Sequence, residues 1–433
     1  MTRFLLRLSA IGLAAVSTTA LAVTPVNLIV KQGDSFSFPG PVTRTVTTLN
    51  SPFTNGLGHV GFVAAFDDAT RGIWQNTGWI FVSPAGVTGG ESTMGIGNTP
   101  GTFIYSPAVS GNDAVYTNGG SLLKGTDPIP ALPGRFSTFN SRPTMLPDGK
   151  SHWMGGSAAT PGGTTSNRHM FRASDPTNPL SITVVFSGGD LIDGKPINSS
   201  ASNFDYHISD NGNHHIHVLD MVTGSSANNL HLYLNGGFVA QEGSPVGDGT
   251  NWLNFETPSV NNFEQYVFSG STTGPTASDN FLAYNGSIKV REGQSLDGVL
   301  LATGAAVRAA SINNLGQVAH IWGWGSGSTL REHLFFAPSG DLISSSVRLL
   351  SIGDLIDVDG DTFADYTVTD FKASAAIGPG LDLAEDGRVC VELGITPPSG
   401  GEVEAIVCLA IPEPASAALV ALGGLLLSRR RRR

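Results

Sequence analysis

A short polar turn followed by an alternating strand recurs along this chain of 433 residues, and this repeat limits the possible folds more than any other feature. Alternation of apolar and polar residues, bounded by Gly, Asn and Ser, is the period-two signature of a half-buried β-strand. Seven copies are recognisable, and they are spaced by 38 to 71 residues. Their turns are Asn55-Gly56-Leu57-Gly58, Ser110-Gly111-Asn112, Pro147-Asp148-Gly149, Asp210-Asn211-Gly212, Asn261-Asn262-Phe263, Asn314-Leu315-Gly316 and Glu385-Asp386-Gly387.

Several short strands in each period of about 40–50 residues are typical of β-propeller blades. The seventh copy ends at Ile411 without its last strand, whereas an unmatched strand stands at the other end of the chain, from Val26 to Gly33. Pairing the two would close a ring and hide sheet edges that otherwise invite aggregation. The sequence therefore predicts an all-β fold, a seven-bladed β-propeller closed by the N-terminal strand. Merging the irregular second and third copies would give a six-bladed propeller. A β-solenoid or a pair of β-sandwiches is the alternative fold.

The repeats form one predicted domain, residues 23–411, without an internal boundary. A content of 55 Gly, 25 Pro and only 14% charged residues suits many turns and short strands, and it argues against long helices. A propeller uses a chain of this length as one domain, so length alone does not require several.

The first 22 residues have the pattern of a secretory signal peptide. Two basic residues, Arg3 and Arg7, precede an apolar run from Ile11 to Val16, and the segment ends at Ala20-Leu21-Ala22. A basic start, a short apolar core and an A-x-A site predict export with cleavage after Ala22. A membrane anchor is the weaker alternative, because the apolar run is too short to span a bilayer.

The last 22 residues, 412–433, form a tripartite tail. A Pro-Glu-Pro motif comes first, then 13 mostly apolar residues from Ala415 to Leu427, and finally five arginines. As a helix, the apolar segment would reach roughly 20 Å, short of the roughly 30 Å hydrocarbon core. The arginines would hold its end on the cytoplasmic side, so a transient membrane association is expected.

This tail resembles the PEP-CTERM sorting signal, which exosortases process. In that family the tail is cut near the Pro-Glu-Pro motif, and the body is released to the cell surface or the extracellular matrix, often alongside exopolysaccharide. The repeat body also resembles the uncharacterised tandem-repeat proteins that often carry such a tail, and that resemblance implies no activity. The residues that carry the sorting resemblance are Pro412, Glu413, Pro414, Arg429, Arg430, Arg431, Arg432 and Arg433.

The charge of the predicted mature chain argues against nucleic acid as a partner. Without the two terminal segments, 17 basic and 34 acidic residues remain, a net charge of −17. Such a surface repels phosphate backbones. Polysaccharide and matrix proteins remain the expected partners, besides exosortase for processing.

Two cysteines, Cys390 and Cys408, are the only ones in the chain, and they lie on the two predicted strands of the last repeat. An even cysteine count in an exported chain favours a disulfide. The alternative is a pair of buried thiols on neighbouring strands.

An acidic turn is the candidate metal site. Asp357, Asp359, Asp361 and Asp365 occupy positions 1, 3, 5 and 9 around Gly360. Calcium takes six to eight oxygen ligands, and alternating acids around a glycine turn can wrap one ion. The spacing resembles the calcium loops of integrin-type propeller repeats, although Val368 stands where an EF-hand has glutamate. A solvated acidic turn is the alternative; calcium is the only cofactor predicted.

Histidines and tryptophans supply weaker candidates. His215 and His217 share one strand face, and a metal site built with His152 is conceivable, although ordinary strand histidines are more common. Trp322 and Trp324 alternate onto one face and could stack on sugar rings, whereas blade-core packing is the commoner use of such aromatics.

The sequence contains no G-x-S-x-G, H-E-x-x-H or paired Cys-x-x-Cys motif. The absence of a marked reacting centre favours a binding or structural role at the cell surface or in the matrix. The alternative is a secreted polysaccharide hydrolase or lyase, since propellers host enzymes on variable loops. Such an enzyme would use Asp or Glu with a histidine such as His152 or His215 at the mouth of the channel.

Overall fold

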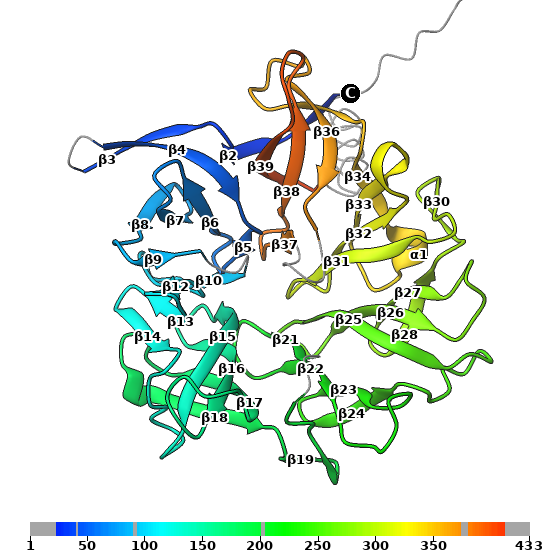
Figure 1. Ribbon diagram of the computed structural model, residues 1–433. Helices are drawn as coiled ribbons and strands as arrows, with labels where there is room; N and C mark the ends of the chain where they lie inside the picture. The colour runs from blue at the N-terminus through cyan, green and yellow to red at the C-terminus, as the bar shows by residue number, and fades with distance from the viewer. Residues whose placement is uncertain (1–22, 40–41, 90–92, 201–203, 374–379, 412–433) are drawn as a thin grey trace, which may run out of the picture.

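The computed structural model describes residues 23–39, 42–89, 93–200, 204–373 and 380–411. In these ranges the chain is a β-propeller whose sheets surround a central axis (Figure 1). Helix in the described residues amounts to α1 (Leu342–Ser345) and two 3₁₀ turns, Pro179–Ser181 and Gly327–Thr329. The all-β prediction is therefore confirmed. The predicted signal peptide, residues 1–22, and the sorting tail, residues 412–433, lie outside the described residues.

Six sheets contain four neighbouring antiparallel strands of at least five residues each, and these are the regular blades. The first three are β4 (Val42–Leu49), β6 (Val60–Phe66), β7 (Arg71–Gln75) and β8 (Gly78–Val82); β15 (Phe136–Met145), β16 (Ser151–Ala158), β17 (Asn167–Ala173) and β18 (Ile182–Ser187); and β21 (Phe204–Ile208), β22 (His215–Asp220), β23 (Leu230–Leu234) and β24 (Gly237–Gln241). The next two are β25 (Trp252–Val260), β26 (Tyr266–Thr272), β27 (Asn280–Tyr284) and β28 (Ser287–Arg291); and β31 (Ala306–Ile312), β32 (Val318–Trp324), β33 (Arg331–Ala337) and β34 (Val347–Ser351). The sixth joins the two ends of the described chain: β36 (Tyr366–Phe371), β38 (Val389–Thr396), β39 (Val403–Leu409) and β2 (Asn27–Lys31).

A smaller, irregular sheet lies between the first and second regular blades (Figure 1). Its strands have two to six residues: β9 (Val87–Thr88), β10 (Met94–Ile96), β11 (Phe103–Tyr105), β12 (Ala108–Val109), β13 (Asn112–Thr117) and β14 (Gly120–Lys124). The expected seven regular blades are thus corrected to six, the predicted variant. The physical reason is that the second predicted turn, at Gly111, joins β12 to β13 instead of the first two strands of a blade.

The remaining strands are additions to the blades. The inner strands β5 (Phe53–Thr54) and β37 (Leu381–Leu383) pair with β6 and β38, and β3 (Ser35–Phe38) pairs with β4. Strand β1 (Val23–Pro25) runs parallel to β35 (Leu355–Asp357). Two small hairpins connect blades: β19 (Leu191–Ile192) with β20 (Lys195–Pro196), and β29 (Ser295–Leu296) with β30 (Val299–Leu300).

The N-terminal strand closes the ring as predicted. Strand β2 pairs antiparallel with β39, with Asn27 opposite Cys408 and Lys31 opposite Ala405. Val30 is fully buried between the closing blade and the first blade. The closure is therefore held by both backbone hydrogen bonds and apolar burial.

Strand alternation sends successive side chains to the two neighbouring blades, so each interface between blades is a separate apolar core. On β22, Ile216 and Val218 pack toward the β25 blade, whereas Leu219 packs toward the β15 blade. Trp322 belongs to such a core and is completely buried, while Trp324 packs against the same core and is half-buried. Stacking of Trp322 on sugar rings is therefore wrong.

Candidate functional site

The turn between the two innermost strands of each regular blade points to one end of the channel, which we call the channel mouth. Three of these turns begin with an asparagine whose side chain organises the turn. The Oδ1 atom of Asn261 accepts hydrogen bonds from the backbone N–H groups of Phe263 and Gln265, both at 3.0 Å. The side chains of Asn55 and Asn313 do the same in their own turns. Asparagine suits this place because its short side chain reproduces a backbone acceptor.

The turns are also hydrogen-bonded from blade to blade. The backbone N–H of Asn211 donates to Oδ1 of Asn262 (2.8 Å), whose own N–H donates to Oδ1 of Asn314 (2.7 Å). The N–H of Asn314 in turn donates to the carboxylate of Glu385 (3.1 Å). Further along, Arg388 donates to the carbonyl oxygen of Gly58 (2.7 Å). The repeated turn residues therefore lock neighbouring blades together around the axis.

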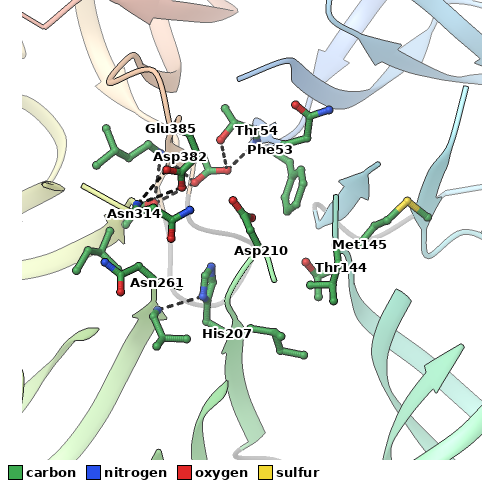
Figure 2. Close-up of a pocket in the computed structure, with 17 residues that line it drawn as sticks. Phe53, Thr54, Thr144, Met145, His207, Asp210, Asn261, Asn314, Asp382 and Glu385 are labelled. Atoms are coloured by element: carbon green, nitrogen blue, oxygen red, sulfur yellow. Dashed lines mark hydrogen bonds between the residues drawn. The ribbon is translucent and has the colours of Figure 1, made fainter. Parts of the chain in front are cut away.

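A small cavity lies inside this belt of turns, on the channel axis (Figure 2). Its volume is about 50 Å³, which holds a few water molecules but no sugar ring. The polar side chains that line it are Thr54, Asn55, Thr144, His207, Asp210, Asn261, Ser311, Asn314, Asp382 and Glu385.

Three carboxyl groups converge on the cavity (Figure 2). Asp382 links two other blades, because its carboxylate accepts hydrogen bonds from the backbone N–H of Thr54 (2.7 Å), the Thr54 hydroxyl (3.0 Å) and the Ser311 hydroxyl (3.0 Å). Asp210 and Glu385, from different blades, lie close enough for their charges to interact. Asp382 thus has a structural role, while Asp210 and Glu385 share the open part of the cavity.

Burial and mutual repulsion change the protonation of these acids. Burial raises the pKa of Asp210 to about 6, with a further contribution from the charge of Asp382. Burial and the charge of Asp210 raise the pKa of Glu385 to about 7. Ionisation of either carboxyl group disfavours ionisation of the other, so the two groups titrate as an interacting pair. Burial lowers the pKa of His207, whose Nδ1 accepts a hydrogen bond from the N–H of Val260 (3.1 Å), so this imidazole is neutral.

Chemically, the cavity offers two carboxyl groups with raised pKa values, a neutral imidazole and several amide and hydroxyl groups. Carboxyl groups of glycosidases stand about 5 Å or more apart, on both sides of the scissile bond. A cavity of about 50 Å³ leaves no room for a sugar ring between two such groups. The arrangement therefore suits ordered water or a small cation better than cleavage of a sugar chain.

Sequence reasoning located part of this cavity. Asp210 and Glu385 begin two of the predicted turns, but no special role was assigned to either. His207 and Asp382 were not anticipated at all. The available signal was position in the repeat: Asp210, Asn314 and Glu385 occupy the same place in equivalent turns, so they had to meet at the axis once a ring formed.

The two predicted histidine candidates lie elsewhere. His152 and His215 do not line the cavity but lie in the interface between the β15 and β21 blades, where His152 is 6% exposed. In the described residues the histidine that lines this cavity is His207. The structure therefore does not bring His152 or His215 to the cavity.

The predicted calcium turn joins β35 to β36. Oxygen atoms of Asp357, Asp359 and Asp361 lie within 4.8 Å of one another. Asp365 is turned to the backbone instead, where its carboxylate accepts from the N–H of Val358 (2.8 Å). Asp357 is buried, and it accepts from the N–H groups of Gly360, Thr362 and Asp359, at 2.7, 2.9 and 3.1 Å. The acids thus shape the turn by themselves, and the calcium site stays a prediction.

The two cysteines face each other on β38 and β39 and form a disulfide. Their Cα atoms are 4.1 Å apart, and both residues are buried against the first blade. The bond therefore reinforces the blade that the N-terminal strand completes.

Around the channel mouth, three turns expose a large apolar side chain at the same place. Leu57, Phe263 and Leu315 are 57%, 70% and 66% exposed, and we call them the rim residues. Phe263 and Leu315 stand on neighbouring blades, whose turns are hydrogen-bonded through Asn262 and Asn314. The rim is thus an apolar surface on a rigid base.

No family model matches the chain, and no curated protein matches it. Solved structures are similar to it at low identity. Hydrazine synthase of Kuenenia stuttgartiensis has 10% identity and a TM-score of 0.45, covering 84% of this chain and 99% of that chain. The β-propeller domain of Cps50 (Swd1) from Myceliophteria thermophila has 7% identity and a TM-score of 0.40, covering 89% and 100%. The WD40 β-propeller domain of Doa1 has 11% identity and a TM-score of 0.32, covering 73% and 93%.

These similarities concern the fold alone, and no function is inferred from them. Within the described residues, no helix has both the length and the apolar character needed to cross a membrane.

Proposed function

We propose that this chain is an exported, exosortase-processed protein of the cell surface or extracellular matrix, and that it binds polysaccharide through its channel mouth without catalysis. The export and sorting parts are supported by the sequence of the two terminal segments. The observation that supports the binding part is the rim, in which Leu57, Phe263 and Leu315 are exposed on turns that are locked to one another.

Physical reasoning links this rim to a long polymer. Large apolar side chains exposed at equivalent places often mark an interaction surface. Phe263 offers a ring face to the C–H surface of a sugar, and the side-chain NH2 group of the exposed, neighbouring Asn211 can donate hydrogen bonds. Because the turns are already ordered, binding costs little conformational entropy. A shallow surface suits a polymer that passes across it, whereas the cavity beneath is too small for a sugar ring.

A second candidate function rests on the two raised pKa values in the cavity. A secreted hydrolase or lyase would use the protonated member of the Asp210–Glu385 pair as general acid and the ionised one as base. The small volume of the cavity favours binding over this alternative.

The experiment is co-sedimentation of the protein with the producer's own exopolysaccharide, together with sizing of the polysaccharide. Binding without shortening is expected, and Phe263→Ser combined with Leu315→Ser should weaken it by roughly tenfold, as about 1.4 kcal/mol of lost contact does. Leu191→Ser is the matched control. Leu191 is 69% exposed but follows β18, which runs away from the channel mouth, so its loss should have no effect.

Two results would contradict the proposal. Equal sedimentation of the rim variant and the Leu191→Ser control would exclude the rim as the binding surface. Release of oligosaccharides that disappears in Asp210→Asn or Glu385→Gln would establish the hydrolase instead.

The sorting part has its own test. Mass spectrometry of the mature protein should find neither residues 1–22 nor the five terminal arginines. An intact C-terminus recovered from the cell envelope would exclude processing.

A further inference from the structure

Three histidines face one another across the interface between the β15 and β21 blades. On β16, Trp153 packs toward the small sheet, so its neighbours His152 and Met154 point the other way, toward the β21 blade. On β22, Ile216 and Val218 pack toward the β25 blade, so His215 and His217 point toward the β15 blade. Strand alternation thus places all three imidazoles in one interface.

Ring contacts support this placement. The rings of His215 and His217 are 5.0 Å apart between centroids. The ring of His217 also stands edge-on to Phe186 of the facing blade, 5.3 Å away. His152 lies close enough that its charge would lower the pKa of His217, and the charge of His215 would lower the pKa of His152.

The three imidazoles lack the hydrogen bonds that other buried histidines have. The Nδ1 atoms of His152, His215 and His217 are buried without a partner. By contrast, Nδ1 of His169 bonds to the hydroxyl of Ser187 (2.8 Å), and Nδ1 of His333 bonds to that of Ser351 (2.6 Å). An unpaired buried nitrogen costs about 1–3 kcal/mol, so three of them in one interface need an explanation.

His320 shows that one such nitrogen alone is not enough. Its Nδ1 is also unpaired, but its Nε2 bonds to Ser346 (3.1 Å) and its ring stacks on Phe335. The cluster of three differs because its members could share one partner.

The electrostatic surroundings keep the cluster neutral. His152 and His217 are only 6% and 5% exposed, and such burial disfavours the charged imidazolium form. The nearest charged groups are Arg172, beside His152 on β17, and Asp148, which is paired with Lys150 at 2.5 Å. Neutral imidazoles without a competing proton are the ligands that zinc and copper prefer.

We propose that His152, His215 and His217 form a binding site for a divalent transition-metal ion of the zinc or copper class. Their ligand nitrogens do not all lie within 4.8 Å of one another, so binding requires the rings to turn about their side-chain torsions. A bound ion would satisfy buried nitrogens and cross-link two blades, and it would therefore stabilise the folded ring.

The test uses tag-free protein carrying Asp359→Asn and Asp361→Asn, so that the acidic turn does not compete for metal. Titration calorimetry with ZnCl₂ and with CuCl₂ should give one equivalent per chain. Replacing His152 or His217 by Gln should weaken binding by at least about 10- to 100-fold, the loss that follows even from removing an outer partner of a ligand. His214→Gln is the matched control, because His214 bonds to Asn235 (3.0 Å) and should not affect the affinity.

Two outcomes overturn the proposal: no binding at millimolar metal, or equal binding by the His152 and His217 variants. If those variants misfold, electron paramagnetic resonance of the protein with all three histidines in place and one equivalent of Cu²⁺ decides whether the site exists. Nitrogen hyperfine splitting from more than one imidazole supports the site, and its absence refutes it.

Discussion

Two sectors of the ring depart from the simple four-strand blade, and they do so in opposite ways. The closing blade takes β36, β38 and β39 from the C-terminal part of the chain and β2 from the N-terminal part, with strands of five to eight residues and a disulfide. The small sheet takes all its strands from one continuous segment, and β10 and β11 have only three residues each. One sector is thus built by long-range pairing and the other by local pairing.

The small sheet compensates for its short strands by side-chain burial. Phe103, Ile104 and Tyr105 are almost completely inaccessible, and Phe81 of the preceding blade packs against Phe103 with ring centroids 5.0 Å apart. The closing blade relies on covalent and backbone links as well. A sector of the ring can therefore be stabilised either by long paired strands or by side-chain packing against the neighbouring blades.

The largest expected effect comes from removing the N-terminal strand. Deleting residues 23–33 removes β2, in which Val30 is completely buried, and leaves the edge of β39 unpaired. Each fully buried valine contributes about 1.5–3 kcal/mol, so the free energy of unfolding should fall by roughly 5 kcal/mol or more with the backbone pairing included. Thermal unfolding should shift for the whole ring. A truncated protein that melts like the full chain would show that closure is unnecessary.

The second effect concerns the disulfide of the closing blade. Cys390→Ala with Cys408→Ala opens a loop of 18 residues, and the chain-entropy model then predicts a loss of about 3 kcal/mol. Chemical denaturation with and without reductant measures it. Reductant should destabilise the natural protein but not the double variant, and an equal response of both would contradict a stabilising disulfide.

The third effect tests packing in the small sheet. A Cβ atom on Gly95 would lie 2.2 Å from the backbone nitrogen of Met145, so Gly95→Ala forces the small sheet away from the next blade. A loss of about 2 kcal/mol is expected for such overpacking. Gly78→Ala is the control, because nothing lies within 4 Å of its Cβ position. Equal melting temperatures for the two variants would show that the small sheet tolerates displacement.

A smaller effect should distinguish the two sectors by pH. Burial and the charge of Glu404 raise the pKa of Glu392, on β38, to about 8. The folded state therefore keeps a proton on Glu392 that the unfolded chain releases above about pH 4.5. The resulting contribution of Glu392 to the free energy of unfolding is complete below that pH and is lost as the pH rises toward 8. The slope is at most about 1.4 kcal/mol per pH unit.

Hydrogen exchange at pH 6 and 8 should show this loss in the closing blade, while Glu392→Gln should reduce the dependence to the part that Glu385 contributes and leave the small sheet unchanged. An unaltered slope in the variant would assign the pH effect to another group.

The smallest expected effect is that of calcium on the acidic turn beside β35. An ion that binds only the folded state stabilises that state by mass action. The gain in the free energy of unfolding is about 1 kcal/mol if millimolar calcium exceeds the dissociation constant several-fold. Thermal scans with calcium or a chelator measure the shift, and Asp359→Asn with Asp361→Asn should remove it. Equal midpoints at millimolar calcium would leave Asp357 and its neighbours as a turn without an ion.

The amino-acid sequence by itself determined the strands, most of their turns and the partner of the N-terminal strand. These follow from short-range chemistry. Alternation of apolar and polar residues selects β-strands, Asn and Gly allow the turns, and the unmatched N-terminal strand supplies the strand that the last repeat lacks. Six of the seven predicted turns lie between the two innermost strands of a regular blade.

Only the tertiary structure decided which residues meet. Thr54 and Asp382 are 328 positions apart and bond between neighbouring blades, and Asp210 and Glu385 line one cavity from different blades. His152, His215 and His217 meet because the side-chain directions of two separate strands agree. Such contacts depend on ring closure and strand register, which no local pattern encodes, and this is why the cavity and the histidine cluster emerged only from the folded ring.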